Sequence, residues 1–183
     1  MNKSELRRQI RGLKASYTAK QLHSMSLVVC EQVLALPQWQ SAQTVLLYSS
    51  LSDEVDTSLL ISTAMQQGKQ VLLPSLLSSH SLRGEDMELR IFTGVQSMQM
   101  GPFGILEPVG EVFPAERYAD IQLAVIPGMA FDDGKHRLGR GKGYYDKFLP
   151  GLPSAYKVGI CFPFQHLPSI PSEPHDVLMD MIV

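Results

Sequence analysis

The segment of the sequence with the clearest chemical potential is PGMAFDDGKHRLGRGKGYYDKF, residues 127–148. Four of the 16 Lys and Arg residues lie between positions 135 and 142, with glycines among them. The cations are Lys135, Arg137, Arg140 and Lys142, and the glycines are Gly134, Gly139, Gly141 and Gly143. Glycines let backbone N–H groups approach phosphoryl oxygens, and guanidinium and ammonium groups neutralise phosphate charge. The pattern therefore predicts a polyphosphate site.

The spacing of these glycines matches neither common phosphate-binding motif. His136 stands where a GxxxxGK[ST] loop needs its first glycine, and GRGKG is not GxGxxG. An ordinary solvated basic loop is therefore an alternative. Asp146, with Asp132 and Asp133 before the loop, favours a binding site, because carboxylates beside phosphates hold Mg²⁺. Asp146 would alternatively complement the positive end of a helix.

A second group of cations lies near the start of the chain. Lys3, Arg7, Arg11 and Lys14 recur at helical spacing, in a stripe beside Leu6, Ile10 and Leu13, which we expect to face the core. Lys3 in a first helical turn opposes the helix dipole unless an anion is nearby. We therefore infer either an anion site at the edge of a docked helix or a solvated basic face with snorkelling side chains.

Two further groups of polar residues are candidates for a functional site. The SDEVDT segment, residues 52–57, follows a predicted strand, so we expect it on the same edge of the sheet as the glycine-rich loop. Glu54 is suited to bind a ligand with several N–H groups, whereas Asp56 or Thr57 is expected to cap the next helix. His175 and Asp176 would assist a metal or substrate, or form a surface pair.

The order of predicted elements places these groups in an α/β fold. Helical spacing extends over residues 6–36 with a break near 16–18, and Asn2 with Glu5 predicts a capped start. Strands are expected at 44–50, 70–74, 87–92, 121–128 and 156–161, a helix at 57–67, a short helix from about 143, and an edge strand in the tail. Apolar strands without polar alternation are covered on both faces. We predict one domain over residues 1–183, a three-layer α/β/α sandwich with a largely parallel, mixed-edge, Rossmann-like sheet.

Composition narrows the class of protein. The formal charge of −2 excludes a globally basic nucleic-acid binder. The two cysteines, Cys30 and Cys161, lie far apart, and we see no leader pattern or membrane-length apolar run. We therefore expect a cytoplasmic protein with no nucleic-acid or membrane partner, whose cysteines are small buried hydrophobic residues.

The segments KSELR, SDEVDT, GPFGILEP, PGMAFDDGKHRLGRGKGYYDKFL and EPHD, in that order, resemble those of the 5-formyltetrahydrofolate cyclo-ligase family, also called 5,10-methenyltetrahydrofolate synthetases. The resemblance extends over essentially the whole chain. It implies the ATP-dependent conversion of 5-formyltetrahydrofolate to 5,10-methenyltetrahydrofolate, with Mg²⁺ as cofactor and ATP as co-substrate. We expect these two small molecules to be the partners of a monomer.

The resemblance also implies roles for individual residues, with Asp146 at the magnesium position. The implied ATP-binding residues are Lys3, Arg7, Arg137, Leu138, Gly139, Arg140, Gly141, Lys142, Gly143, Tyr144 and Tyr145. The implied folate-binding residues are Ser49, Glu54, Phe103, Arg140, Gly141, Lys142, Gly143 and Tyr144, with Phe103 on the pterin ring. Among these we expect Arg140, Lys142 and Tyr144 to take part in catalysis.

The same residues allow two alternative functions, which belong to other classes of protein. An enzyme that uses ATP or a sugar phosphate with another substrate would keep the same loop. An RNA-binding module would use the basic loop with Tyr144 and Tyr145 as stacking platforms. The net negative charge of the chain and the position of both tyrosines at a helix start argue against the RNA reading.

Overall fold

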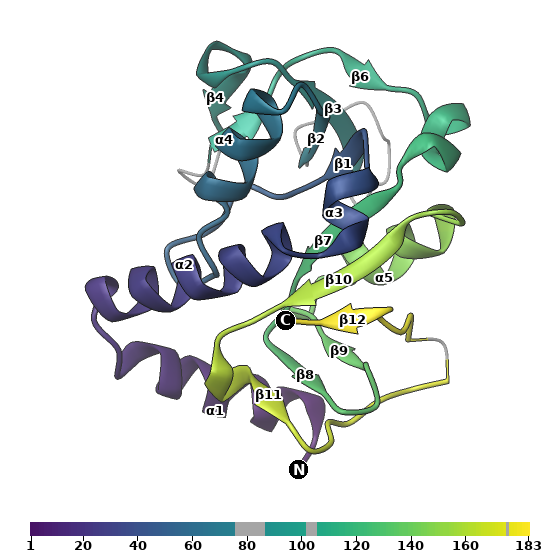
Figure 1. Ribbon diagram of the computed structural model, residues 1–183. Helices are drawn as coiled ribbons and strands as arrows, with labels where there is room; N and C mark the ends of the chain where they lie inside the picture. Colours follow the sequence, from purple (N-terminus) through teal and green to yellow (C-terminus); the bar gives the residue numbers. More distant parts are fainter. Residues whose placement is uncertain (76–86, 102–105, 175) are drawn as a thin grey trace.

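The structure is a computed structural model and describes residues 1–75, 87–101, 106–174 and 176–183. Its centre is a seven-stranded sheet with the order β12-β10-β7-β1-β2-β3-β6 (Figure 1). The strands of this sheet are β1 (Thr44–Leu46), β2 (Gln70–Ser75), β3 (Glu88–Phe92), β6 (Val112–Phe113), β7 (Leu123–Pro127), β10 (Tyr156–Ile160) and β12 (Met181–Ile182). Neighbours from β12 to β2 pair in parallel, whereas β3 and β6 are antiparallel. The expected tail strand is thus present at one edge.

The first two helices begin at residues whose side chains cap them. Asn2 forms a reciprocal capping box with Glu5 at α1 (Lys3–Ala15), as predicted, and Thr18 does the same with Gln21 at α2 (Ala19–Leu34). The remaining helices are α3 (Pro37–Ser41), α4 (Ser58–Gln66) and α5 (Tyr144–Phe148), with 3₁₀ turns η1 (Val95–Ser97), η2 (Ala115–Asp120), η3 (Leu149–Gly151) and η4 (Pro163–Gln165). The predicted break between the first two helices is confirmed.

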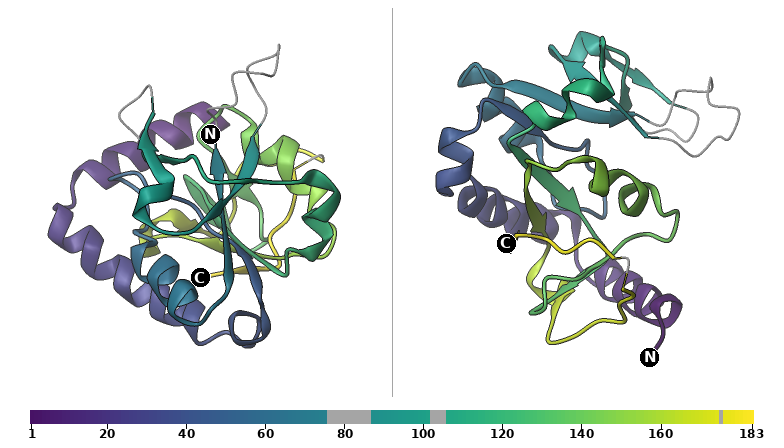
Figure 2. Two further views of the ribbon diagram at one scale, coloured as in Figure 1. Left: turned by 90° about the horizontal axis from the view of Figure 1, so that it is seen from above. Right: turned by 90° about the vertical axis from the view of Figure 1, so that its right-hand side faces the viewer.

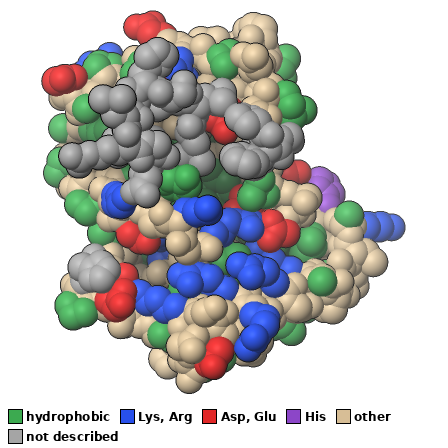
Figure 3. Space-filling view, turned by 180° about the vertical axis from the view of Figure 1, so that it is seen from behind, with side chains coloured by type: hydrophobic (Ala, Val, Ile, Leu, Met, Phe, Trp, Pro, Cys, Tyr) green, Lys and Arg blue, Asp and Glu red, His purple; other side chains and the backbone are tan. Residues whose placement is uncertain are grey.

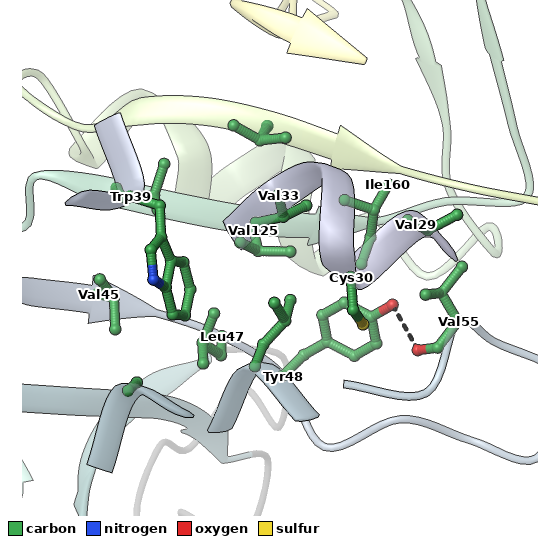
Figure 4. Close-up of a cluster of buried hydrophobic side chains, with 14 of the residues drawn as sticks. Val29, Cys30, Val33, Trp39, Val45, Leu47, Tyr48, Val55, Val125 and Ile160 are labelled. Atoms are coloured by element: carbon green, nitrogen blue, oxygen red, sulfur yellow. Dashed lines mark hydrogen bonds between the residues drawn. The ribbon is translucent and has the colours of Figure 1, made fainter. Parts of the chain in front are cut away.

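Helices cover both faces of the sheet, as the two views of Figure 2 show. On one face α2, α3 and α4 pack on alternate strand residues; Figure 4 shows Cys30 of α2 beside the Tyr48 ring, whose hydroxyl donates to the Val55 carbonyl at 3.0 Å. On the other face α5 and η3 bury Phe148 and Leu149 against the sheet. The central strands β7, β1 and β2 thus bury side chains in both directions, and the predicted three-layer α/β/α architecture is confirmed.

The chain after β7 differs from the glycine-rich loop that we expected. It forms β8 (Ala130–Asp132) and β9 (Arg137–Leu138), which join β11 (His166–Leu167) in a second, three-stranded sheet. The turn closes because Asp132 accepts a hydrogen bond from the backbone of His136 at 2.9 Å. Between β9 and the helix that starts at Tyr144, residues 139–143 remain a loop. Strands β4 (Met98–Met100) and β5 (Leu106–Pro108) pair in antiparallel fashion in a separate two-stranded sheet.

Helix α1 packs on this second sheet, at the end of the molecule that also holds β8 and β11 (Figure 1). Leu6 and Ile10 are fully buried there with Leu138. The helix therefore lies directly beside the strand that leads into the 139–143 loop. No helix in the described ranges is long and apolar enough to cross a membrane.

Candidate functional site

The predicted phosphate and folate segments meet at one edge of the main sheet. Strands β1 and β7 are parallel neighbours, so the chain leaves both of them on the same side. Residues 51–54 follow β1, and the 139–143 loop follows β7 by way of β8 and β9. This juxtaposition was expected from the strand order.

Arg140 makes the contact between the two segments. Its Nε donates to Glu54 at 2.8 Å and its Nη2 donates to Asp53 at 2.5 Å. Burial opposes the charge of Arg140, but the hydrogen bond to Asp53 and the field of Glu54 outweigh it and raise the pKa of Arg140. The side chain remains 37% exposed, so a ligand still has access to the cation.

The 139–143 loop owes its path to two glycines. Gly141 has φ of 102° and Gly143 has φ of 73°, values that side chains rarely tolerate. A Cβ on Gly141 would lie 3.5 Å from the guanidinium carbon of Arg7. Lys142 between them is exposed, and Tyr144, which starts α5, is half-buried. The loop thus presents Lys142 outward, while its neighbour Gly141 lies beside Arg7.

Arg7 is the cation of α1 that reaches this loop. Its Nε donates to the carbonyl of Gly139 at 2.8 Å, so helix and loop form one surface. Figure 3 shows Lys and Arg side chains gathered in a band across the face opposite to that of Figure 1. The predicted convergence of the helix and loop cations is therefore present at Arg7.

Lys3 has a different environment from the one we expected. Its ammonium group donates to Glu173 at 2.8 Å and to Asp176 at 3.0 Å, both in the tail. Burial opposes the charge of Lys3, but these two carboxylates outweigh it and raise its pKa. The acidic tail therefore supplies the anions that a cation in the first turn of α1 requires.

Arg137 and Leu138 belong to β9 and are buried. Arg137 donates to Asp146 at 2.5 Å and to the Pro127 carbonyl at 3.2 Å, and its guanidinium lies 5.3 Å from the centre of the Tyr145 ring. Burial raises the pKa of Tyr145. Arg137 therefore holds α5 against the end of β7, whereas Leu138 packs on α1.

Glu54 and Ser49 lie where a folate site was expected. One oxygen of Glu54 accepts from Arg140 and the other accepts from the backbone N–H of Leu51 at 3.0 Å. The side chain is 10% exposed. Ser49 is half-buried beyond the end of β1. Phe103 and His175, which we also singled out, lie outside the described residues.

The acidic residues differ in whether their carboxylate oxygens are available to bind a metal. Asp132 is buried and accepts from the backbone N–H groups of His136 and Ile170, both at 2.9 Å. Asp133 pairs with His166 at 3.1 Å. Among the described residues there is no group of three His, Cys, Asp or Glu side chains that would hold a metal. Asp146 uses Oδ1 for Arg137 and is 38% exposed, which leaves Oδ2 as a candidate ligand.

Asp56 and Thr57 both hold the start of α4, in different ways. The Asp56 carboxylate accepts from the backbone N–H of Ser58 at 2.9 Å, whereas the Thr57 hydroxyl donates to the Tyr48 carbonyl. Asp56 therefore caps the helix, and Thr57 fastens its start to the end of β1. Both cysteines are free and buried, as expected.

No role was predicted for Asp53, and Lys14, which we placed in the cation stripe of the first helix, has an unexpected environment. Asp53 is bound to Arg140, and its other oxygen lies 3.4 Å from the ammonium of Lys14. We expected Leu13 to face the core, yet Leu13 is 37% exposed and Lys14 is 4% exposed. Helical spacing alone leaves the choice between these neighbours open at the edge of the stripe. The ion pair with Asp53 accounts for the burial of Lys14 rather than Leu13.

Comparisons with known proteins agree with this geometry. A model of the 5-formyltetrahydrofolate cyclo-ligase family matches residues 1–183. A relative from Schizosaccharomyces pombe is 33% identical over 198 residues, covering 100% of this chain and 95% of its own length. The 5-formyltetrahydrofolate cyclo-ligase of Haemophilus influenzae is 30% identical, with 99% and 97% covered.

A solved structure supports the same assignment. The NMR structure of 5,10-methenyltetrahydrofolate synthetase from Aquifex aeolicus superposes with a TM-score of 0.83 and 31% identity, covering 100% of this chain and 89% of that one. Sequence and fold thus agree over the full length of the chain. This protein belongs to the 5-formyltetrahydrofolate cyclo-ligase family.

Proposed function

We propose that this enzyme converts 5-formyltetrahydrofolate and ATP to 5,10-methenyltetrahydrofolate, ADP and phosphate. The observation that carries the proposal is the contact of Arg140 with Glu54 at 2.8 Å. It joins the loop suited to phosphate with the carboxylate suited to the N–H groups of a pterin. Family membership supplies the substrate class.

The proposed chemistry explains why cations, rather than a protein nucleophile, gather here. A formamide oxygen is a poor leaving group. The γ-phosphoryl group of ATP is transferred to this oxygen, so a P–O bond to ADP breaks and a P–O bond to the formyl oxygen forms. Folate nitrogen 10 then attacks the formyl carbon, the C–O bond breaks, and phosphate leaves with the proton of that nitrogen. Such transfer needs positioning and charge neutralisation.

The residues divide this work between them. Arg140 and Lys142 neutralise the charge on the transferred phosphoryl group, Arg7 binds the phosphate chain of ATP from the helix side, and Tyr144 bounds the site at the start of α5. Ser49 and Glu54 bind the folate and hold its two reacting nitrogens in register. Lys3, Arg137 and Tyr145 complete the proposed ATP site, with Arg137 and Tyr145 acting from beneath the loop.

Asp146 fits a magnesium ion that travels with ATP. Mg²⁺ in nucleotide sites usually takes one or two protein carboxylates and fills its remaining positions with phosphate oxygens and water. The partly exposed Asp146 carboxylate, with one oxygen on Arg137, supplies one such ligand. When bound, the metal would neutralise charge on the phosphates.

An absorbance assay tests the function directly. The purified protein is mixed with 5-formyltetrahydrofolate and MgATP, and methenyltetrahydrofolate is followed in the near ultraviolet, where the substrate is almost transparent. We expect product formation with one phosphate released per product, and none when ATP is omitted. A folded sample that forms no such product excludes the proposal, and turnover of ATP without folate would favour another ATP-using enzyme.

We also make proposals about the cellular location and the oligomeric state of the enzyme. We infer that the enzyme works in the cytoplasm, a reducing compartment, because both cysteines are free thiols. The pKa of Cys30 and that of Cys161 are each raised to about 12 by burial, which suits inert core residues. We also propose a monomer, as the family resemblance led us to expect; light scattering of the purified protein tests this.

A further inference from the structure

Asp53 stands between two cations that come from different parts of the chain. Its Oδ1 accepts from Nη2 of Arg140 at 2.5 Å, and its Oδ2 lies 3.4 Å from Nζ of Lys14. Arg140 belongs to the glycine-rich loop, whereas Lys14 belongs to the last turn of α1. The Asp53 carboxylate thus connects a loop that a ligand must enter with a helix that is fixed in the core.

Lys14 is the rigid side of this connection. Its side chain is only 3% exposed, although α1 leaves neighbouring Leu13 in solvent. A buried ammonium group is costly unless it is paired, so the Asp53 carboxylate is what makes this position tolerable. Burial lowers the pKa of Lys14, and the charge of Asp53 opposes that effect.

Arg140 is the adjustable side. It lies between Gly139 and Gly141 in a loop with little conformational restraint of its own. Its Nε is held by Glu54 and its Nη2 by Asp53, so two edges of the planar guanidinium are fixed. In the described part of the chain Nη1 makes no hydrogen bond or ion pair, so it remains available for a phosphate oxygen.

A folate bound at Glu54 weakens the contact between Glu54 and Arg140. In the proposed function Glu54 accepts hydrogen bonds from the pterin, and it then has less capacity for Arg140. Asp53 is the partner that stays in place, because its other oxygen is held by Lys14. The 51–54 turn is itself closed by the backbone of Glu54 donating to Leu51 at 3.0 Å, so Asp53 has a fixed base.

We propose that Asp53, anchored by Lys14, is a positioning residue that aims the Arg140 guanidinium at the phosphoryl group during transfer. This inference rests on the proposed function. It assigns Asp53 no contact with either substrate. Its effect passes through Arg140 alone, which distinguishes it from a residue that merely stabilises the turn.

A double-mutant cycle tests this dependence. Asp53→Asn keeps the size of the side chain but removes its charge, and we expect kcat to fall on the order of 10- to 100-fold, with KM for ATP nearly unchanged. Arg140→Lys provides the second background, because lysine keeps the charge but lacks the planar fork by which a guanidinium is held in one orientation between two carboxylates. Adding Asp53→Asn to Arg140→Lys is then expected to change kcat less than about twofold.

Independent effects overturn the proposal. If Asp53→Asn lowers kcat by the same factor in both backgrounds, Asp53 acts on its own, and if kcat is unchanged in the wild-type background, Asp53 positions nothing. Asp120→Asn is the matched control, because Asp120 forms an exposed ion pair with Arg117 at 2.9 Å in η2. That variant should retain the wild-type kcat.

Lys14→Met tests the anchor. Methionine fills the buried volume without the charge, and we expect kcat to fall in the wild-type background but not further in the Asp53→Asn background. Should Lys14→Met fail to fold, the Asp53 and Arg140 cycle still decides the proposal. If the wild-type protein itself forms no methenyltetrahydrofolate, the proposed function fails; an active wild type with an undiminished Asp53→Asn variant defeats this inference alone.

Discussion

The two ends of helix α1 each carry a lysine that is bound to carboxylates, in contrasting surroundings. Lys3 at the start pairs with Glu173 and Asp176 of the tail, and its side chain is 26% exposed. Lys14 at the end pairs with Asp53 and is 3% exposed. The first pair includes a carboxylate, Glu173, that is 55% exposed. The partners reverse this order, because Asp53 is 36% exposed and Asp176 is 8% exposed. One helix therefore carries a partly exposed lysine at its start and a buried lysine at its end.

This difference determines what each cluster is able to do. An exposed ion pair contributes little to stability, so its cation can be transferred to a ligand phosphate at small cost. The Lys14 pair is expensive to separate, because the buried ammonium group left alone is a desolvated charge. We therefore assign ligand binding to the Lys3 end and positioning to the Lys14 end. The predictions below test that division.

The largest effect is expected where the buried cluster meets the ligand. Arg140→Ala should lower kcat/KM by about 1.5–3 kcal/mol of transition-state stabilisation, because a charge-assisted contact is lost. It also leaves Asp53 and Glu54 as neighbouring carboxylates without their shared cation. Steady-state kinetics of methenyltetrahydrofolate formation measures the loss.

Lys142→Ala is the companion variant in the same loop. Lys142 is exposed, and in the described ranges no carboxylate pairs with it, so its substitution should lower turnover without disturbing the 51–54 turn. Circular dichroism should show wild-type folding for both variants. Wild-type kcat/KM in either folded variant would remove that residue from the catalytic assignment.

The second effect separates the two ends of α1. Lys3→Ala and Arg7→Ala should each weaken ATP binding roughly tenfold, the loss of one charge-assisted contact. Neither should lower the free energy of unfolding by more than about 1 kcal/mol, because Lys3 and Glu173 are partly exposed and Arg7 loses one hydrogen bond, to the Gly139 carbonyl. Nucleotide titration calorimetry and urea unfolding measure the two quantities.

Lys14→Ala is the contrasting variant. It removes a buried stem and the anchor of Asp53, so it should lower the free energy of unfolding by about 1–3 kcal/mol. ATP affinity should change less than in Lys3→Ala. Unchanged ATP affinity in Lys3→Ala would leave Lys3 a structural ion pair and reverse the assignment of the exposed end.

The sequence predicts the strands, their order of succession and the capped start of α1 because these features depend on residues close together in the chain. The capping box joins residues three apart, and the apolar runs of β1 and β7 are continuous. The common edge of these strands then brings Arg140 to Glu54 by topology. Local patterns thus account for the position of the site.

The internal structure of the site depends on pairs that no local pattern contains. Asp53 meets Lys14 across 39 positions and Arg140 across 87. The prediction of a loop at Arg137 was wrong because a two-residue strand is too short to show alternation. Arg137 is buried together with its two partners, Asp146 and the Pro127 carbonyl. The amino-acid composition of the segment does not reveal these contacts.

A third, smaller effect tests the metal assignment of Asp146. Asp146→Asn keeps an oxygen for Arg137 and should cost no more than about 1 kcal/mol of folding stability if the residue serves only its helix and that contact. As a magnesium ligand, its loss should instead raise the Mg²⁺ concentration for half-maximal activity, since hard cations prefer anionic oxygens. Activity titrated with Mg²⁺ at saturating ATP distinguishes the two.

The control for that titration is folate binding without metal, which should stay nearly intact in Asp146→Asn. An unchanged Mg²⁺ curve with a lower melting temperature would make Asp146 a structural residue. Asp132 is a poor substitute, because its oxygens already accept from two backbone N–H groups and the His136 ring. The search would then turn to the acidic tail.

The smallest effect is a difference of sign between the two lysines in alkaline solution. Burial lowers the pKa of Lys14 from its ordinary 10.5 despite Asp53, so the unfolded state holds its proton more tightly and Lys14 adds stability as pH rises toward 10.5. The carboxylates of the tail outweigh burial and raise the pKa of Lys3, so its contribution is complete below 10.5 and is lost as pH rises through the higher folded value. Urea unfolding of wild type, Lys3→Met and Lys14→Met from about pH 8 to about pH 11.5 gives two difference curves, in which all shared ionisations cancel. Wild type should gain stability over Lys14→Met and lose it relative to Lys3→Met across that range. Two curves of the same sign would mean that both ends of α1 hold their lysines in equivalent surroundings, and the division between a binding end and a positioning end would fail.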